Sequence, residues 1–188
     1  MWVFIALAAV VVIIALWIVG VYNGLIRKRT YVKEAESRID VNLKQKVNVL
    51  NNLVDTVKMQ TAYEGETLVK IIDARNQMKS SNVAEALKAN DNVTNNLLPG
   101  IFALSESYPQ LRANDGFTKI MAEIKDVEQK VAFSRTSYNT AVFNLNTAIN
   151  VFPSNIIARM FGFRSSEMYE IGETERKNAD DYRISDHK

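Results

Sequence analysis

The sequence lacks most of the residues on which common catalytic and metal sites depend. It contains no cysteine, which excludes disulfides, cysteine-ligated metals and cysteine nucleophiles. Its single histidine is His187, near the C-terminal end, so a histidine-based dyad and a zinc-protease motif are not expected. No glycine-rich loop follows a predicted strand, which argues against a phosphate-binding loop. We therefore expect no enzyme, no cofactor and no metal site.

Charge is scarce at one end of the chain and abundant at the other. No charged side chain occurs from Met1 to Ile26, whereas residues 164–188 are rich in both signs and show no periodicity. The net charge of +2 is too small, and too little clustered, for a nucleic-acid-binding surface. We expect three regions: a transmembrane helix at 1–26, a helical bundle domain at 27–163 and a polar, disordered tail at 164–188.

The N-terminal apolar run has the ~20 residues that a helix needs to cross a membrane. A cleaved signal peptide would carry basic residues first and a shorter apolar core of about 7–15 residues, so we expect a retained helix. Basic residues follow the run, which places the N-terminus outside and the C-terminal domain in the cytoplasm. A stop-transfer flank explains them, and binding of anionic membrane lipid is the alternative. These residues are Arg27, Lys28, Arg29 and Lys33.

Apolar residues recur at helical spacing through the middle of the chain. The first series is interrupted by Glu64 and Arg75, which mark either a buried site or, as we favour, charges at the rim of the core. The segment from Tyr63 to Glu66 contains Gly65 and is the point at which this helix can break into two. The series comprises Leu43, Leu50, Val57, Ile71 and Met78.

Two further apolar series predict the remaining long helices. Asn82 or Ser81 can cap the second helix, and Pro99 predicts a kink or a split near Asn95. Asn114 or Asp115 can cap the third. The fold class expected is all-α, with the transmembrane helix followed by an antiparallel up-and-down bundle that has coiled-coil periodicity; four segments are favoured and three are the alternative. The series are Val83, Leu87, Asn90, Leu97, Ile101 and Leu104, then Phe117, Ile124, Val131, Tyr138, Leu145 and Phe152.

The end of the third helix differs from the rest. Asn139, Asn146 and Asn150 share a separate face, where we expect solvated amides or, alternatively, a hydrogen-bond ladder to asparagines of the first helix. Pro153 suits the start of a short helix that Gly162 closes. That helix is too apolar to bury its side chains within itself, so it docks either at the bilayer or on the end of the bundle. Its candidate interaction patch is Ile156, Ile157, Met160, Phe161 and Phe163.

Several stretches, taken together and in order, resemble the LemA family of bacterial membrane proteins. Three positions depart from the family pattern: Glu36 replaces an aromatic, Asn51 a proline and Tyr63 a histidine. The resemblance implies a single-pass membrane protein with a helical bundle and no established enzymatic activity. The stretches are "YNGLIRKR", "EAESRIDVNLKQK", "NLVDTVK", "SYPQLRAN", "SRTSYNTAVFNLNTAI" and "FPSNIIARMFGF".

Two functional hypotheses follow from these features. The first is a non-enzymatic, membrane-anchored interaction or scaffold module at the cytoplasmic face of the bacterial inner membrane. Its partner would be an unidentified membrane or cytoplasmic protein, or a second copy of the chain in a homo-oligomer. The alternative is a lipid-associated structural protein that stabilises or shapes the membrane. Both involve membrane lipid as a partner, and neither involves nucleic acid.

Overall fold

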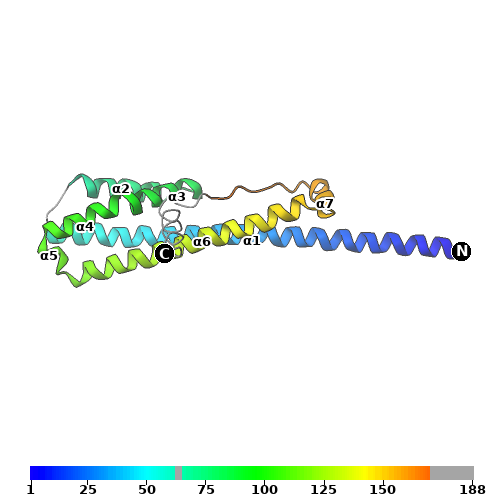
Figure 1. The fold of residues 1–188 in the computed structure, drawn as a ribbon, viewed down its shortest axis with the longest axis horizontal. Helices are drawn as coiled ribbons and strands as arrows, with labels where there is room; N and C mark the ends of the chain where they lie inside the picture. The colour runs from blue at the N-terminus through cyan, green and yellow to red at the C-terminus, as the bar shows by residue number, and fades with distance from the viewer. Residues whose placement is uncertain (62–64, 170–188) are drawn as a thin grey trace, which may run out of the picture. The chain divides into compact units, whose positions relative to one another are not determined.

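The computed structural model describes residues 1–61 and 65–169, which form helices joined by short connections (Figure 1). No strand occurs within these two ranges, in agreement with the all-α prediction. The elements are α1 (Trp2–Thr61), α2 (Glu66–Gln77), α3 (Val83–Asn92), the π-helical turn η1 (Val93–Leu97), α4 (Leu98–Ser107), α5 (Pro109–Arg112), α6 (Asp115–Asn150) and α7 (Ser154–Met160).

The first part of α1 carries the apolar run. Its most apolar stretch reaches a mean hydropathy of 3.1, and none of that stretch is buried within the protein. Among the residues that the structure describes, α1 is the one helix that meets the length and composition needed to cross a membrane. Because α1 continues unbroken to Thr61, no flexible linker interrupts the chain between the apolar run and the later part of this helix.

The contacts divide the chain into two units. Unit 1 comprises Met1–Ala35 with Thr136–Met168, and unit 2 comprises Glu36–Arg135 with Tyr169–Lys188. Of that last segment, only Tyr169 lies within the described ranges. Helices α1 and α6 contribute to both units, so each takes part in two separate sets of packing contacts.

Unit 2 is a bundle of four helical segments that run alternately in opposite directions (Figure 1). The segments are the second part of α1, then α2, then α3 with η1 and α4, and the first part of α6. This is the favoured arrangement of the two that the sequence permits. The core is apolar and includes Ile39, Leu43, Leu50, Val57, Leu68, Ile71, Leu87, Ile101, Ile124 and Val127.

Capping and proline chemistry fix the helix ends of unit 2 where the sequence predicts them. The Oδ1 atom of Asn82 accepts hydrogen bonds from the amides of Ala84 and Glu85, and that of Asn114 accepts from the amide of Phe117. Pro99 lies in the first turn of α4, and the distortion predicted before it takes the form of η1. The first helix ends at Thr61 and α2 begins at Glu66, while Tyr63 and Glu64 lie outside the described ranges.

In unit 1, α7 packs beside α1. Ile157 and Ala158 are buried, and the ring of Tyr22 lies 4.7 Å from that of Phe161 and 5.9 Å from that of Phe163. Gly162, at φ +69°, ends the helix as predicted, because a left-handed residue at this position favours glycine. The tyrosine near the end of the apolar run therefore sets the place at which α7 docks.

Residues 163–169 are not helical, and some of them make hydrogen bonds that their lack of periodicity does not predict. Asn146 donates through Nδ2 to the carbonyl of Ser166 (2.9 Å) and accepts the Ser166 amide through Oδ1 (3.0 Å). The hydroxyl of Tyr138 donates to the carbonyl of Glu167 (3.1 Å). Asn146 thus belongs neither to a solvated face nor to a ladder between helices. Residues 170–188, for which we expect disorder, lie outside the described ranges.

Candidate functional site

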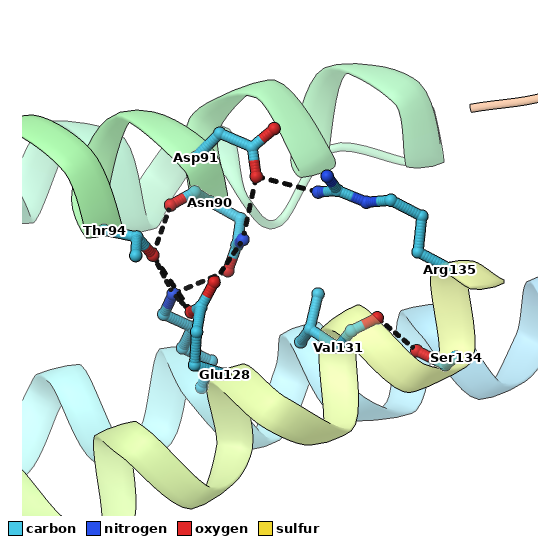
Figure 2. A network of polar contacts seen from close by, with 8 residues as sticks. Asn90, Asp91, Thr94, Glu128, Val131, Ser134 and Arg135 are labelled. Atoms are coloured by element: carbon cyan, nitrogen blue, oxygen red, sulfur yellow. Dashed lines mark hydrogen bonds and ion pairs between the residues drawn. The ribbon is translucent and has the colours of Figure 1, made fainter. Parts of the chain in front are cut away.

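Six polar side chains meet inside unit 2, across three of its four segments. We call this cluster the polar brace; Figure 2 shows five of its members with the helices that carry them. Lys46 comes from α1, the next three members come from α3 (Asn90 and Asp91) and η1 (Thr94), and the remaining two, Glu128 and Arg135, come from α6. Its members are Lys46, Asn90, Asp91, Thr94, Glu128 and Arg135.

Lys46 is the centre of the polar brace. It is 0% exposed, and its Nζ donates to Oδ1 of Asn90 and Oγ1 of Thr94, each at 2.7 Å. It also forms an ion pair with Glu128, whose side chain is 29% exposed. All three donors of the ammonium group therefore have acceptors, which is the condition for keeping a buried amine in its charged form.

Electrostatics and burial act on Lys46 in opposite directions. Burial lowers the pKa of Lys46 below its ordinary value, and the charge of Glu128 and its hydrogen bond oppose that shift. Thr94 completes the pairing because its hydroxyl donates to the same Glu128 oxygen, at 2.9 Å. Removing one member would leave the others buried without full compensation. The Lys46–Glu128 ion pair, together with Thr94, therefore requires α1, η1 and α6 to pack together correctly.

A second ion pair forms the outer edge of the polar brace. Nη2 of Arg135 donates to Oδ1 of Asp91 at 2.7 Å, and Nδ2 of Asn90 reaches the same oxygen at 3.2 Å (Figure 2). The Arg135 side chain is 5% exposed and that of Asp91 is 32% exposed. This pair therefore joins α6 to α3.

The polar brace borders a hollow of about 510 Å³ in unit 2. Volumes of a few hundred cubic ångströms are typical of sites that receive a ligand or an anchoring side chain. The walls come from α3, η1, α4 and α6, and they combine apolar with charged side chains. The apolar residues are Leu98, Pro99, Phe102, Met121, Ile124, Val131 and Ala132, and the charged ones are Asp91, Lys125, Glu128 and Arg135.

The π-helical turn belongs to both features. Thr94 lies in η1, where it reaches Lys46 and Glu128, and it also lines the hollow. A π-turn inserts an extra residue into a helix and is frequent at functional positions. Here it allows consecutive turns of one segment to serve the polar brace and the wall of the hollow.

The sequence carries a signal for the polar brace within the apolar series themselves. Lys46 lies three residues after Leu43 and four before Leu50, so it shares their face. Glu128 lies four residues after Ile124 and three before Val131, so it shares their face in the same way. Opposite charges that lie on the apolar faces of two helices indicate a buried ion pair. The charged positions predicted from the first series, Glu64 and Arg75, are different ones.

Arg75 proves to be half-buried rather than part of the polar brace. Its Nη1 donates to Oδ1 of Asn51 at 2.7 Å, which joins α2 to α1. Glu64 lies outside the described ranges. Asn51 therefore has a role in the bundle that a proline, as the family pattern has there, could not fulfil.

The basic flank predicted from the sequence follows directly on the apolar run in α1. Arg27, Arg29 and Lys33 are exposed, and Lys28 is half-buried. The guanidinium of Arg29 lies 5.5 Å from the ring centroid of Phe163, a distance typical of a cation–π contact. The flank and the segment after α7 therefore meet within unit 1.

The residues of the predicted interaction patch differ in how far the protein buries them. Ile157 is 2% exposed, and Phe163 is half-buried with its ring 5.9 Å from that of Tyr22 in α1. Ile156, Met160 and Phe161 remain on the surface, at 49%, 68% and 51% exposed. Phe152, just before α7, is 80% exposed. Ile157 is thus packed within the protein and Phe161 contacts Tyr22 while half exposed, whereas Ile156 and Met160 stay exposed.

Comparison with known proteins places these features in a family. The family model of the LemA family matches residues 35–181. The chain belongs to the LemA family. The polar brace, the hollow and α7 all lie within the matched residues, and family membership together with the apolar part of α1 is consistent with a single-pass membrane protein.

Two kinds of relative in this LemA comparison are informative. Protein LemA of Metamycoplasma hominis is 26% identical over 166 residues, which cover 86% of this chain and 74% of that protein. Magnetosome protein MamQ 2 of Paramagnetospirillum magneticum is 23% identical over 175 residues, covering 79% of this chain and 64% of that protein. Magnetosome protein MamQ of Magnetospirillum gryphiswaldense is 22% identical over 174 residues, with the same two shares of 79% and 64%. The chain thus spans less than two thirds of the length of the MamQ proteins.

Proposed function

We propose that this LemA-family chain is a non-enzymatic, membrane-anchored interaction module. In this proposal the apolar part of α1 spans the bacterial inner membrane, and the bundle of unit 2 binds another protein on the cytoplasmic side. The observation that carries the proposal is the hollow beside the polar brace, which lies in a helical unit reached from the apolar run by one unbroken helix. Neither the family nor the relatives described above is known for an enzymatic activity.

The composition of the hollow supports binding of a protein side chain. Its lining is largely apolar, so an apolar anchor residue entering it would lose contact with water, which is the main source of affinity at the centre of an interface. The charged side chains of its walls supply polar partners for the backbone and side chains around that anchor. The ion pairs of the polar brace hold the walls in place before binding, which reduces the entropy lost on association.

The cytoplasmic orientation is supported by the basic flank. Arg27, Lys28, Arg29 and Lys33 follow the apolar run, and Lys and Arg accumulate on the cytoplasmic side of membrane spans. An impermeant thiol reagent offered to cells carrying a single cysteine at Lys188 tests this orientation, since labelling from outside would reverse it.

The partner-binding proposal is tested by site-specific photo-crosslinking in the native membrane. A photoreactive amino acid at Phe102, which is 53% exposed and lines the hollow, should yield a discrete adduct with a second protein. The matched control is Val69 of α2, which is 52% exposed and does not line the hollow. A photoreactive group at Val69 should give no such adduct.

A pair of substitutions then shows whether the hollow is required. Phe102→Glu should abolish stoichiometric recovery of the cross-linked partner after capture in mild detergent, and Val69→Glu should leave it unchanged. Both positions are half exposed, so both variants should keep their helical circular dichroism. Equal recovery with the two variants would refute a role for the hollow. Recovery of anionic lipid without any stoichiometric protein would favour the alternative function.

The alternative is a lipid-associated structural protein that stabilises or shapes the membrane. The exposed apolar side chains of α7, together with the adjacent basic residues, are the observation that favours it. The two functions are compatible in one chain because they use different units.

A further inference from the structure

An apolar surface remains on unit 1 after α7 has docked. It consists of five large side chains that are between 48% and 80% exposed, and we call it the apolar patch. Contiguous apolar surface of this kind is uncommon on proteins that contact only water, where it promotes aggregation. Its residues are Val151, Phe152, Ile156, Met160 and Phe161.

The contacts of α7 fix the apolar patch at one end of the apolar run. The Phe161 ring lies 4.7 Å from that of Tyr22, and both belong to unit 1. A helix from Trp2 to Tyr22 is about 30 Å long at roughly 1.5 Å per residue, which matches the thickness of the hydrocarbon core. Tyrosine is enriched where that core meets the headgroups. The apolar patch therefore lies at the level of this boundary.

The charges around the apolar patch are complementary to anionic headgroups. Arg159 lies in α7 and Arg164 lies four residues after it, and no acidic residue occurs from Val151 to Ser166. Arg27 and Arg29 are exposed on the adjacent turns of α1, and Arg29 contacts Phe163. Each basic residue close to an anionic leaflet contributes about 1 kcal/mol of attraction. Apolar side chains flanked in this way are typical of helices that lie in a membrane interface.

We propose that the apolar patch inserts into the membrane that α1 crosses, so that α7 forms a second, interfacial attachment beside the span. This inference rests on the membrane-spanning part of the proposed function and is independent of partner binding by the hollow. Ile157 and Ala158 are buried within the protein, while the exposed side chains of the apolar patch enter the lipid. The chemistry recognised is an acyl-chain boundary with anionic headgroups above it.

The absence of cysteine allows a direct test in the full chain. Single cysteines at Met160, Met168 and Ile13 would each carry a nitroxide in vesicles of phosphatidylcholine with anionic phosphatidylglycerol, at a low ratio of protein to lipid. Met168 is the matched control, because it is also an exposed methionine of unit 1, at 48%. Its neighbour Glu167 bonds to Tyr138, which lies fourteen residues, or roughly 20 Å of helix, before Phe152. Ile13, in the apolar run, is the reference for lipid.

The expected result is that oxygen relaxes the nitroxide at Met160 more strongly than a polar nickel complex does, as at Ile13, and that the order is reversed at Met168. Relaxation at Met160 like that at Met168 would overturn the proposal. A nitroxide at Met160 that neither agent reaches would also overturn it, and would indicate burial against a protein or a second copy. Water-like relaxation at Ile13 would refute the membrane span itself. Loss of the Phe102 adduct alone would refute only partner binding.

A second variant guards against a chance orientation of the label. Met160→Asp introduces a charge at a position that is 68% exposed, so the helix should stay folded. It should reduce the ratio of oxygen to nickel relaxation for a nitroxide at Phe152 by at least about threefold, whereas Met168→Asp should not change it. An unchanged ratio in both variants would contradict insertion of the apolar patch.

Discussion

Units 1 and 2 place polar and apolar groups in opposite ways. Unit 2 buries Lys46 and Arg135 among its helices, and its exposed large apolar residues are scattered singly, as on most protein surfaces. Unit 1 exposes nearly every side chain of its apolar run and the whole apolar patch. The first arrangement suits a protein in water with internal polar contacts. The second suits a protein whose surroundings are themselves apolar.

The largest effect should come from charging the docked face of α7. Ile157→Asp places a carboxylate where the side chain is 2% exposed, and this should destabilise docking by roughly 4 kcal/mol or more. Hydrogen exchange of the α7 amides in detergent should then become about a thousandfold faster. Ile156→Asp, at a position 49% exposed, is the control and should change exchange by less than about tenfold. Equal effects would mean that the two faces do not differ.

The next largest effect should come from breaking the buried ion pair of unit 2. Lys46→Ala removes one member of a buried ion pair and should lower the free energy of unfolding by about 3–5 kcal/mol. Lys44→Ala removes an exposed pair with Asp40 on the same helix, and should cost no more than about 0.5 kcal/mol. Urea unfolding of the full chain in micelles, followed by circular dichroism, measures both.

A double variant separates a stabilising contact from an unpaired charge. Lys46→Met with Glu128→Leu replaces both partners by apolar side chains, and should recover most of the stability lost in Lys46→Ala. If the double variant is as unstable as the single one, the polar brace contributes more than mutual neutralisation. Thr94 and Asn90 would then be the residues to replace next, because both bond to Lys46.

The smallest effect concerns the segment after α7. Asn146→Ala removes both side-chain bonds to Ser166 and should cost about 1–2 kcal/mol, seen as faster exchange of the Ser166 amide. Asn150→Ala is the control, because among the described residues the side-chain amide of Asn150 bonds to a backbone carbonyl one turn back in its own helix and not to the segment after α7. Similar exchange in both variants would show that Asn146 does not hold this segment.

Local chemistry made much of this fold predictable. Asn82, Asn114, Pro99 and Gly162 act through the backbone within a few residues, so their roles follow from the neighbouring sequence. The apolar series likewise identify most of the core, but the expectation for Phe152 is wrong: α6 ends at Asn150, two residues earlier, and Phe152 is 80% exposed. The transmembrane length of the first run needs only a count of residues.

The contacts between distant segments could not be predicted in the same way. Lys46 meets Asn90 and Glu128, which are 44 and 82 residues away, and only the packing of three segments determines that they meet. Ile157 is buried and Ile156 is exposed because of the rotation of α7 about its own axis, and that rotation depends on contacts such as the one with Tyr22. Asn146 pairs with a segment that has no periodicity at all, so no pattern could reveal its partner.

The π-turn η1 has a consequence for the length of the chain. Each residue rotates a helix by about 100°, so the extra residue in this turn sets the phase of everything that follows it in α4. Deleting one residue from Val93–Leu97 would turn Ile101, which is 0% exposed, away from the core. Insertions and deletions among related sequences should therefore be absent from this stretch. They should accumulate instead at residues 79–81, between α2 and the Asn82 cap of α3, where no side chain is buried.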